Sequence, residues 1–162
     1  MTATNLILAL MVITSLIGLY AAPKLIERSL FRPFWLLPRN QYLTLISSGF
    51  VHASMAQLLF NAFTFWSFGT QLEATIGTPR FVTLYCFALL VSDWGTWLKH
   101  RNDANYASLG ASGAILGVLF AAIVYFPRQS LYIMFLPVPI PAPLFAVGYL
   151  AYTWYAARSL RG

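Results

Sequence analysis

Charged side chains and cysteine are scarce in this 162-residue chain. Only 9% of the residues are charged, against about 25% in a typical soluble domain, whereas 59% are hydrophobic. Cys86 is the single cysteine, so no disulfide can form within the chain. A chain of this size cannot bury so much apolar surface in one small core. The composition therefore indicates that a bilayer is its solvent.

The charges that are present argue against a nucleic-acid-binding protein. The formal net charge is +6, from ten basic and four acidic residues. The basic residues are spread over loops, and no basic run is interleaved with aromatic side chains. A nucleic-acid interface is expected to show such a patch. We therefore expect no nucleic-acid partner, and expect the loop cations to meet lipid headgroups.

Five apolar segments approach the roughly 20 residues that a transmembrane helix needs. The sequence MTATN before the first lacks the positive side chain of a signal peptide, so we interpret this segment as a retained span. Four prolines exclude a regular helix before the last segment and predict an extended connector at 136–143. We expect one all-α, polytopic transmembrane helix bundle over residues 1–162, with spans at 4–22, 50–76, 80–98, 110–126 and 143–158.

The segment 23–47, between the first two expected spans, is longer than a simple turn. It mixes aromatic and basic residues, including Phe31, Arg32, Trp35 and Arg39. This composition suits the membrane interface, and we expect the segment to lie there.

Polar side chains stand out within two of the apolar segments. Gln57 and Asn61 are four residues apart and share one helix face, from which both amides can donate to one point. His52 lies nine residues before Asn61, about half a turn around a helix, so we expect it to face elsewhere, near the interface. Ser112 is flanked by small residues at the start of the fourth segment. It could pack within a helix or act as a nucleophile.

Two carboxylates lie in or beside these segments. Glu73 is near the end of the second, where Gly77 is expected to break the helix, so we expect Glu73 to cap or pair at a helix end. Asp93 lies inside the third, where a carboxylate facing lipid is strongly unfavourable, so it should face protein or the interface. In the fourth segment, small residues four apart predict a helix-packing seam: Gly113, Gly117 and Ala121.

Taken in order, three motifs resemble those of the rhomboid family of intramembrane serine proteases. SGFVHASMAQLLFN is similar to the second-span signature, GTQLEATIGTPRF to the turn after it, and GASGAILG to the GxSG nucleophile motif. VPIPAPLFAVGYLAYTWYAAR is similar to the fifth span, and the resemblance covers about residues 38–160. GxSG alone is a weak signal, whereas the ordered set is a specific one.

The resemblance implies a role for each matching residue. Ser112 is the nucleophile, and Asn61 with the Ser112 backbone N–H forms the oxyanion site. Gln57 stands where the family usually has a second histidine, and its amide keeps a donor for the oxyanion. The remaining motif positions are structural: Gly110, Gly113, His52, Glu73 and Gly77. No metal or cofactor is implied. The expected partners are a substrate helix and the bilayer, and a wet cavity should reach the serine.

The chain departs from the family pattern at the general base. That base is a histidine on a sixth span, and the sequence ends at Gly162, before such a span. Only His52 and His100 are present, and neither matches this position. We therefore expect five of six core spans, a domain incomplete at its C-terminus, and no appreciable hydrolysis by residues 1–162 alone. A further departure is Thr44, where the first loop often carries arginine; this change is expected to loosen the loop.

The charge distribution disagrees with the orientation that the resemblance implies. The family places its N-terminus in the cytoplasm, so loops one and three lie outside. These loops carry most of the basic residues, against the tendency of Lys and Arg to stay inside. We follow the resemblance on orientation and expect a multi-pass protein of a bacterial inner membrane.

Together these patterns predict a rhomboid-type serine endopeptidase that, when complete, cleaves transmembrane or juxtamembrane segments of membrane proteins. One alternative is a non-catalytic rhomboid relative that binds membrane clients, which the missing histidine favours. Another is a small transporter or helix-bundle scaffold with Asp93 and Glu73 as polar pathway residues. A transporter would show inverted repeats, and the sequence has none.

Overall fold

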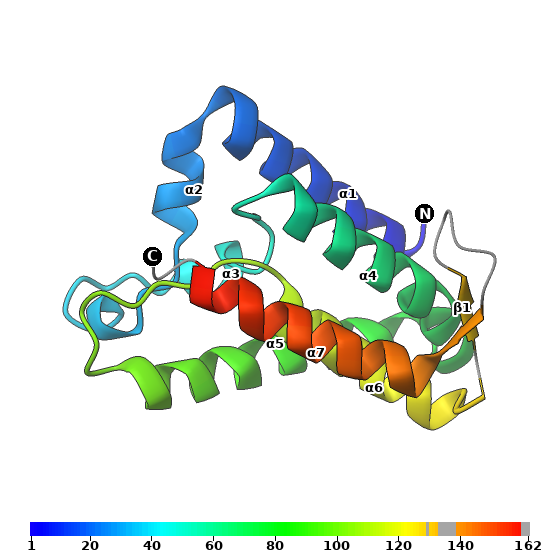
Figure 1. The fold of residues 1–162 in the computed structure, drawn as a ribbon. Coiled ribbons are helices and arrows are strands. Elements are labelled where there is room, and N and C mark those ends of the chain that lie inside the picture. Colours follow the sequence, from blue (N-terminus) through cyan, green and yellow to red (C-terminus); the bar gives the residue numbers. More distant parts are fainter. Residues whose placement is uncertain (129, 133–138, 160–162) are drawn as a thin grey trace.

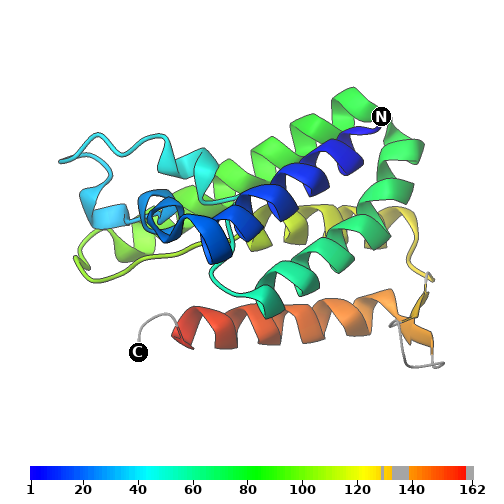
Figure 2. The same ribbon diagram turned by 90° about the horizontal axis from the view of Figure 1, so that it is seen from above.

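The structure, a computed structural model, describes residues 1–128, 130–132 and 139–159. It is an all-α bundle with one short two-stranded ribbon (Figures 1 and 2), as the sequence predicts for the fold class. The first long helix is continued by a π-helical turn, η1 (Ile17–Ala21). The long helices are α1 (Ala3–Leu16), α4 (Met55–Ile76), α5 (Thr78–His100), α6 (Ser112–Tyr125) and α7 (Ala142–Ser159).

Helix α6 occupies the centre of the bundle. It packs against both α4 and α5, while α1 packs along α4 and α7 along α6. A Cβ atom at Gly117 would collide with Ala88, and one at Gly113 would collide with Ser92. The predicted seam therefore brings α6 close to α5 at these two positions. The buried residues of α6 are Ala114, Ile115, Val118, Leu119 and Ala122.

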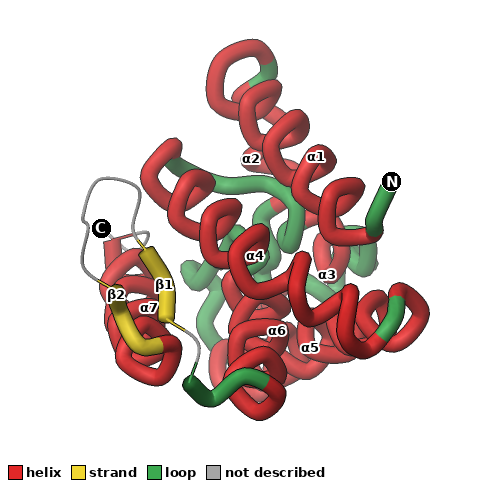
Figure 3. The backbone as a smooth tube through the Cα atoms, turned by 90° about the vertical axis from the view of Figure 1, so that its right-hand side faces the viewer, coloured by secondary structure: helices red, strands yellow, loops and turns green. Residues whose placement is uncertain are grey.

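The predicted spans differ from the helices mainly where a helix begins. The second was expected from residue 50, but α4 begins at Met55 because the Ser54 side chain caps it by accepting from the Gln57 N–H at 3.2 Å. In the proline connector, β2 (Pro139–Pro141) pairs antiparallel with β1 (Ser130–Tyr132), as Figure 3 shows beside α7. Residues 136–138 of that connector lie outside the described residues.

The first loop is a folded element with three short helices, α2 (Pro23–Ser29), η2 (Pro33–Trp35) and α3 (Thr44–Ser47). Its backbone is joined to the α5–α6 loop by two hydrogen bonds between Phe31 and Ser108, at 2.9 and 3.0 Å. η2 also contacts α5. Thr44 is buried, and its hydroxyl donates to the Gln41 carbonyl at 2.6 Å. These contacts hold the first loop against the end of the bundle where α5 ends and α6 begins.

Two stretches of the described chain are long and apolar enough to cross a membrane, Ala3–Ala21 and Thr78–His100. α6 is a shorter apolar helix. Large apolar side chains on the outer faces of these helices are exposed, for example Phe87 at 65% and Val124 at 78%. Exposed apolar stripes of this kind suit contact with lipid.

Glu73 joins three helix ends through its buried carboxylate. Oε1 accepts from the Ala3 N–H at 2.9 Å and the Thr78 hydroxyl at 2.7 Å. Oε2 accepts from the N–H and hydroxyl of Thr4, at 2.8 and 2.6 Å. The prediction that Glu73 caps a helix end is confirmed, and the helix it caps is α1. Gly77 ends α4 as predicted, with a φ of +85° that favours glycine, and α5 begins at the next residue.

Replacing Glu73 with alanine should lower the free energy of unfolding by about 1–3 kcal/mol, because two N-terminal amides of α1 then lose their acceptor. Thermal unfolding in detergent, followed by circular dichroism, measures this change. Glu27→Ala is the control, since Glu27 is exposed on α2. Equal unfolding temperatures for Glu73→Ala and the unchanged chain would contradict the capping role.

Candidate functional site

Ser112 is the first residue of α6, directly after a turn that only glycine fits. Gly110 has a φ of +114°, and a Cβ atom there would lie 2.5 Å from Gln57 Nε2. Its N–H donates to the Ser48 carbonyl at 2.8 Å, which fixes the turn against the first loop. The first N–H groups of a helix have no carbonyl to bond within it, and the helix dipole is positive there. Ser112 therefore lies where a developing negative charge is stabilised.

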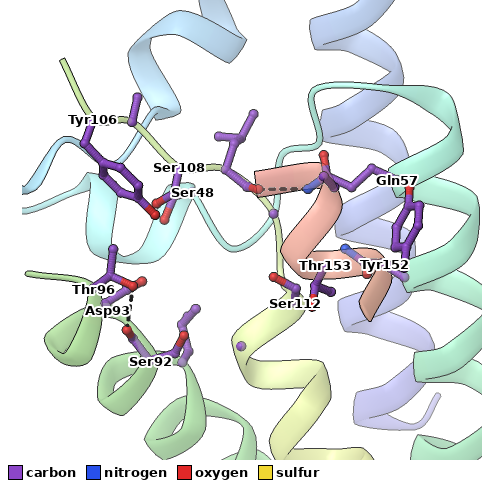
Figure 4. Close-up of a pocket in the computed structure, with 17 residues that line it drawn as sticks. Ser48, Gln57, Ser92, Asp93, Thr96, Tyr106, Ser108, Ser112, Tyr152 and Thr153 are labelled. Atoms are coloured by element: carbon purple, nitrogen blue, oxygen red, sulfur yellow. Dashed lines mark hydrogen bonds between the residues drawn. The ribbon is translucent and has the colours of Figure 1, made fainter. Parts of the chain in front are cut away.

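A polar cavity of about 130 Å³ lies around Ser112 and has room for several water molecules. Figure 4 shows Ser112 between Gln57 of α4 and the polar side chains of α5. Within the described part of the chain, the Ser112 hydroxyl has no hydrogen-bond partner. The polar lining comes from four helices and two loops: Ser48, Gln57, Asn61, Ser92, Asp93, Thr96, Tyr106, Ser108, Ser112, Tyr152 and Thr153.

Gln57 and Asn61 both line this cavity with Ser112, as their four-residue spacing predicts. Gln57 Nε2 donates to the Leu109 carbonyl at 2.9 Å, and its Oε1 accepts from the Ala53 N–H at 3.1 Å. The Gln57 amide therefore joins α4 to the turn before Ser112. One of its two N–H donors is used by this bond, and the other is left for a group in the cavity.

The prediction for His52 is wrong. His52 is fully buried rather than interfacial, and its Nε2 lies 2.9 Å from Asn61 Nδ2. The prediction assumed that His52 and Asn61 lie half a turn apart on one helix. That assumption fails because α4 begins only at Met55 and His52 lies in the preceding loop. Its other ring nitrogen, Nδ1, lies 2.9 Å from Ser15 Oγ in α1.

The hydrogen bonds around His52 fit the neutral ring with its proton on Nδ1. Ser15 Oγ can donate to the Phe50 carbonyl at 3.2 Å and accepts from the His52 N–H at 3.1 Å. With its proton used there, Ser15 accepts from Nδ1–H, and Nε2 accepts from Asn61. Asn61 Oδ1 accepts from the Tyr149 hydroxyl at 2.9 Å. The second N–H of the Asn61 amide is then left for a group in the cavity.

Sequence reasoning missed Ser15 and Tyr149, which complete this chain of hydrogen bonds. Both residues are buried. A serine within the first apolar segment was the one available signal, since a buried hydroxyl needs a partner. Nothing in the sequence indicated that its partner would be His52.

Neither histidine is placed beside the Ser112 hydroxyl in the described structure. His52 is engaged by Ser15 and Asn61. His100 stacks on Tyr106, with ring centroids 3.6 Å apart, and does not line the cavity. Asp93 does line it, which confirms that this carboxylate faces protein rather than lipid. Its buried Oδ2 has no hydrogen-bond partner among the described residues.

No group of three or more His, Cys, Asp or Glu residues that could hold a metal occurs in the described ranges. The site is therefore built from a serine, two amides and the start of a helix. This set can stabilise negative charge on an oxygen next to a hydroxyl nucleophile.

Comparison with known proteins agrees with this constellation. The Rhomboid domain model matches residues 39–160, and the chain belongs to the rhomboid family. It is 34% identical over 123 residues to the rat presenilin-associated rhomboid-like protein, mitochondrial, covering 74% of this chain and 32% of that protein. It is 34% identical over 143 residues to the yeast Rhomboid protein 1, mitochondrial, covering 83% of this chain and 40% of that protein.

A bacterial relative is also similar. "Putative rhomboid protease YdcA" of Bacillus subtilis is 33% identical over 79 residues, covering 49% of this chain and 39% of that protein. The matched part of the chain thus spans between about a third and two fifths of the length of these curated relatives. Family membership and the two long apolar stretches indicate an integral membrane protein. The mitochondrial names of the first two relatives differ from the bacterial membrane expected from the sequence.

Tyr149→Phe should lower the free energy of unfolding by about 1–3 kcal/mol, because buried Asn61 Oδ1 loses its donor while the ring can keep its stacking on Phe60. Tyr155→Phe on the same helix is the matched control, since Tyr155 is 69% exposed. Denaturation in detergent compares the two variants. If both unfold at the same denaturant concentration, the Tyr149 hydroxyl does not support Asn61.

Proposed function

We propose that residues 1–162 form the nucleophile and oxyanion part of a rhomboid-type intramembrane serine endopeptidase. One observation carries this proposal: the Ser112 hydroxyl, the start of α6 and the amides of Asn61 and Gln57 meet at one cavity that can hold water. A serine nucleophile, donors for an oxyanion and access to water are three of the parts that acyl transfer to water requires.

The roles in this reaction follow from the positions of the groups. Ser112 Oγ gives its proton to the general base and attacks the scissile carbonyl carbon, and the carbonyl oxygen becomes an oxyanion. When this intermediate collapses, the C–N bond breaks and the amine leaves with the proton that the base returns. The Ser112 backbone N–H and the second Asn61 N–H donate to that oxyanion, each supplying about 10²–10³ in rate. Gln57 supplies a further donor from one turn earlier on α4. Water from the cavity then attacks the acyl carbon and gives a proton to the base. The ester C–O bond breaks, the acyl group leaves as a carboxylic acid, and the proton returns to Ser112 Oγ.

We infer the substrate class from the apolar helices that surround the site. Ser112 begins an apolar helix, and its cavity is lined by α4, α5, α7 and the loops that hold Ser48 and Ser108. A scissile bond must therefore lie in or beside a transmembrane segment of the substrate. That segment must be extended at the cleavage site, because hydrogen-bonded helical carbonyls are less accessible to attack.

A general base is still required, because a neutral serine hydroxyl is a weak nucleophile. The base must approach the hydroxyl within about 2.6–3.2 Å, directly or through one water. The family resemblance implies a histidine on a further span. Neither His52 nor His100 takes that position in the described structure, so we propose that the base is supplied from outside these residues.

In a form of the protein that includes the base, Ser112→Ala should reduce cleavage of a transmembrane reporter by about 10⁴-fold or more. Ser67→Ala is the control, a half-buried serine on α4 that does not line the cavity. Reporter cleavage in proteoliposomes measures both variants. Turnover near that of the unchanged enzyme in Ser112→Ala would exclude Ser112 as the nucleophile.

The 162-residue chain alone should label slowly with a fluorophosphonate probe, because neither histidine lies beside the serine in the described part of the chain. Gel fluorescence of the purified chain against its Ser112→Ala variant measures this labelling. Rapid labelling that disappears in Ser112→Ala would reveal a base among residues 1–162.

The absence of a histidine beside Ser112 in the described structure favours a second function. In this alternative the protein is a non-catalytic rhomboid relative that binds client helices. It predicts that the longest natural form of the protein binds a transmembrane peptide without cleaving it. Cleavage by that form, abolished in Ser112→Ala, excludes this alternative.

A further inference from the structure

Three arginines stack on tryptophan rings, and all three pairs lie at one end of the bundle. The guanidinium carbon lies 3.8 Å from the ring centroid in the Trp35–Arg39 pair, 5.1 Å in Trp97–Arg101 and 3.6 Å in Trp154–Arg158. These pairs belong to the first loop and to the C-terminal ends of α5 and α7. Figures 1 and 2 both place these segments at the left of the molecule.

The same end carries a groove in the first loop, between α2 and the turn at residues 40–44. Three cationic side chains line it, with a single carboxylate, Glu27. Leu30 and the 82%-exposed Leu43 add apolar surface. We name this site the basic groove; its polar lining is Lys24, Glu27, Arg28, Arg32, Asn40, Gln41 and Thr44.

The cations of the basic groove are not neutralised within the described structure. Lys24 and Arg28 are exposed. Arg32 Nη1 donates to the backbone carbonyl of Glu27 at 3.5 Å. No salt bridge joins the Glu27 carboxylate to these cations in the part of the chain that the structure describes. The groove therefore keeps a surplus of positive charge.

We propose that the basic groove binds the headgroup of an anionic phospholipid. Its cations and amides match the phosphate oxygens of a headgroup, and the leucines can contact the first carbons of the acyl chains. Tryptophan and arginine are favoured at the membrane–water interface, so the three Trp–Arg pairs place this end of the bundle at headgroup depth. The groove goes beyond the proposed protease function, since it requires neither Ser112 nor a substrate.

The opposite end of the bundle provides the comparison. Arg80 lies at the start of α5 and Arg128 follows α6, and both are exposed. Figures 1 and 2 place these segments at the right of the molecule, away from the first loop. Neither arginine lines the basic groove.

The experiment measures selectivity for anionic lipid by tryptophan fluorescence. The full 162-residue chain is reconstituted in phosphatidylcholine vesicles that contain increasing fractions of phosphatidylglycerol with brominated acyl chains. Quenching compared with brominated phosphatidylcholine gives the relative binding constant of the two lipids. Lys24→Gln with Arg28→Gln tests the groove, and Arg80→Gln with Arg128→Gln is the matched control.

We expect the unchanged chain and the control to bind the anionic lipid preferentially, and the groove variant to lose about fivefold or more of that preference. The charge-keeping variant Lys24→Arg with Arg28→Lys should retain the preference, which separates lost charge from lost folding. Equal binding of both lipids by the unchanged chain would overturn the proposal. An equal loss in the control variant would also overturn it.

Discussion

The arrangement of the site depends on a buried chain of hydrogen bonds that runs from Ser15 through His52 and Asn61 to Tyr149. Each of these buried polar groups is tolerated in an apolar environment because its neighbour accepts or donates a hydrogen bond. An isolated amide at the position of Asn61 would be strongly unfavourable there. This series of hydrogen bonds joins α1, the loop before α4, α4 itself and α7. The same contacts therefore hold the helices together and fix the Asn61 amide.

Two features bring Ser112 to the cavity that the Asn61 amide also lines. The glycine turn at Gly110 allows the Gln57 side chain to approach the backbone, and the small residues of α6 allow α5 to pack closely. Helix α6 thereby begins at the cavity, and its unpaired N–H groups face the space that the amides of α4 also face. The cavity and the basic groove lie toward the same end of the bundle, where the first loop is bonded to the α5–α6 loop.

Much of this fold could be predicted because the length of an apolar segment indicates a spanning helix, whatever other helices pack against it. The starts of α4 and α6 were less predictable, since they depend on the Ser54 cap and the Gly110 turn. Gln57, Asn61 and Ser112 could be grouped from spacing and motif order. His52 could not be joined to them, because its position before the helix removes the periodicity on which that inference rested. Its partner Ser15 is 37 residues away, a separation at which no local pattern exists.

The capping of α1 by Glu73 has a consequence for synthesis. Thr4 and Glu73 are 69 residues apart in the chain. At about 5–20 residues per second, translation reaches Glu73 roughly 3–14 s after Thr4. During that interval the first amides of α1 have water rather than Glu73 as their acceptor. The capped form of α1 can therefore be completed only after the last turn of α4 has been synthesised.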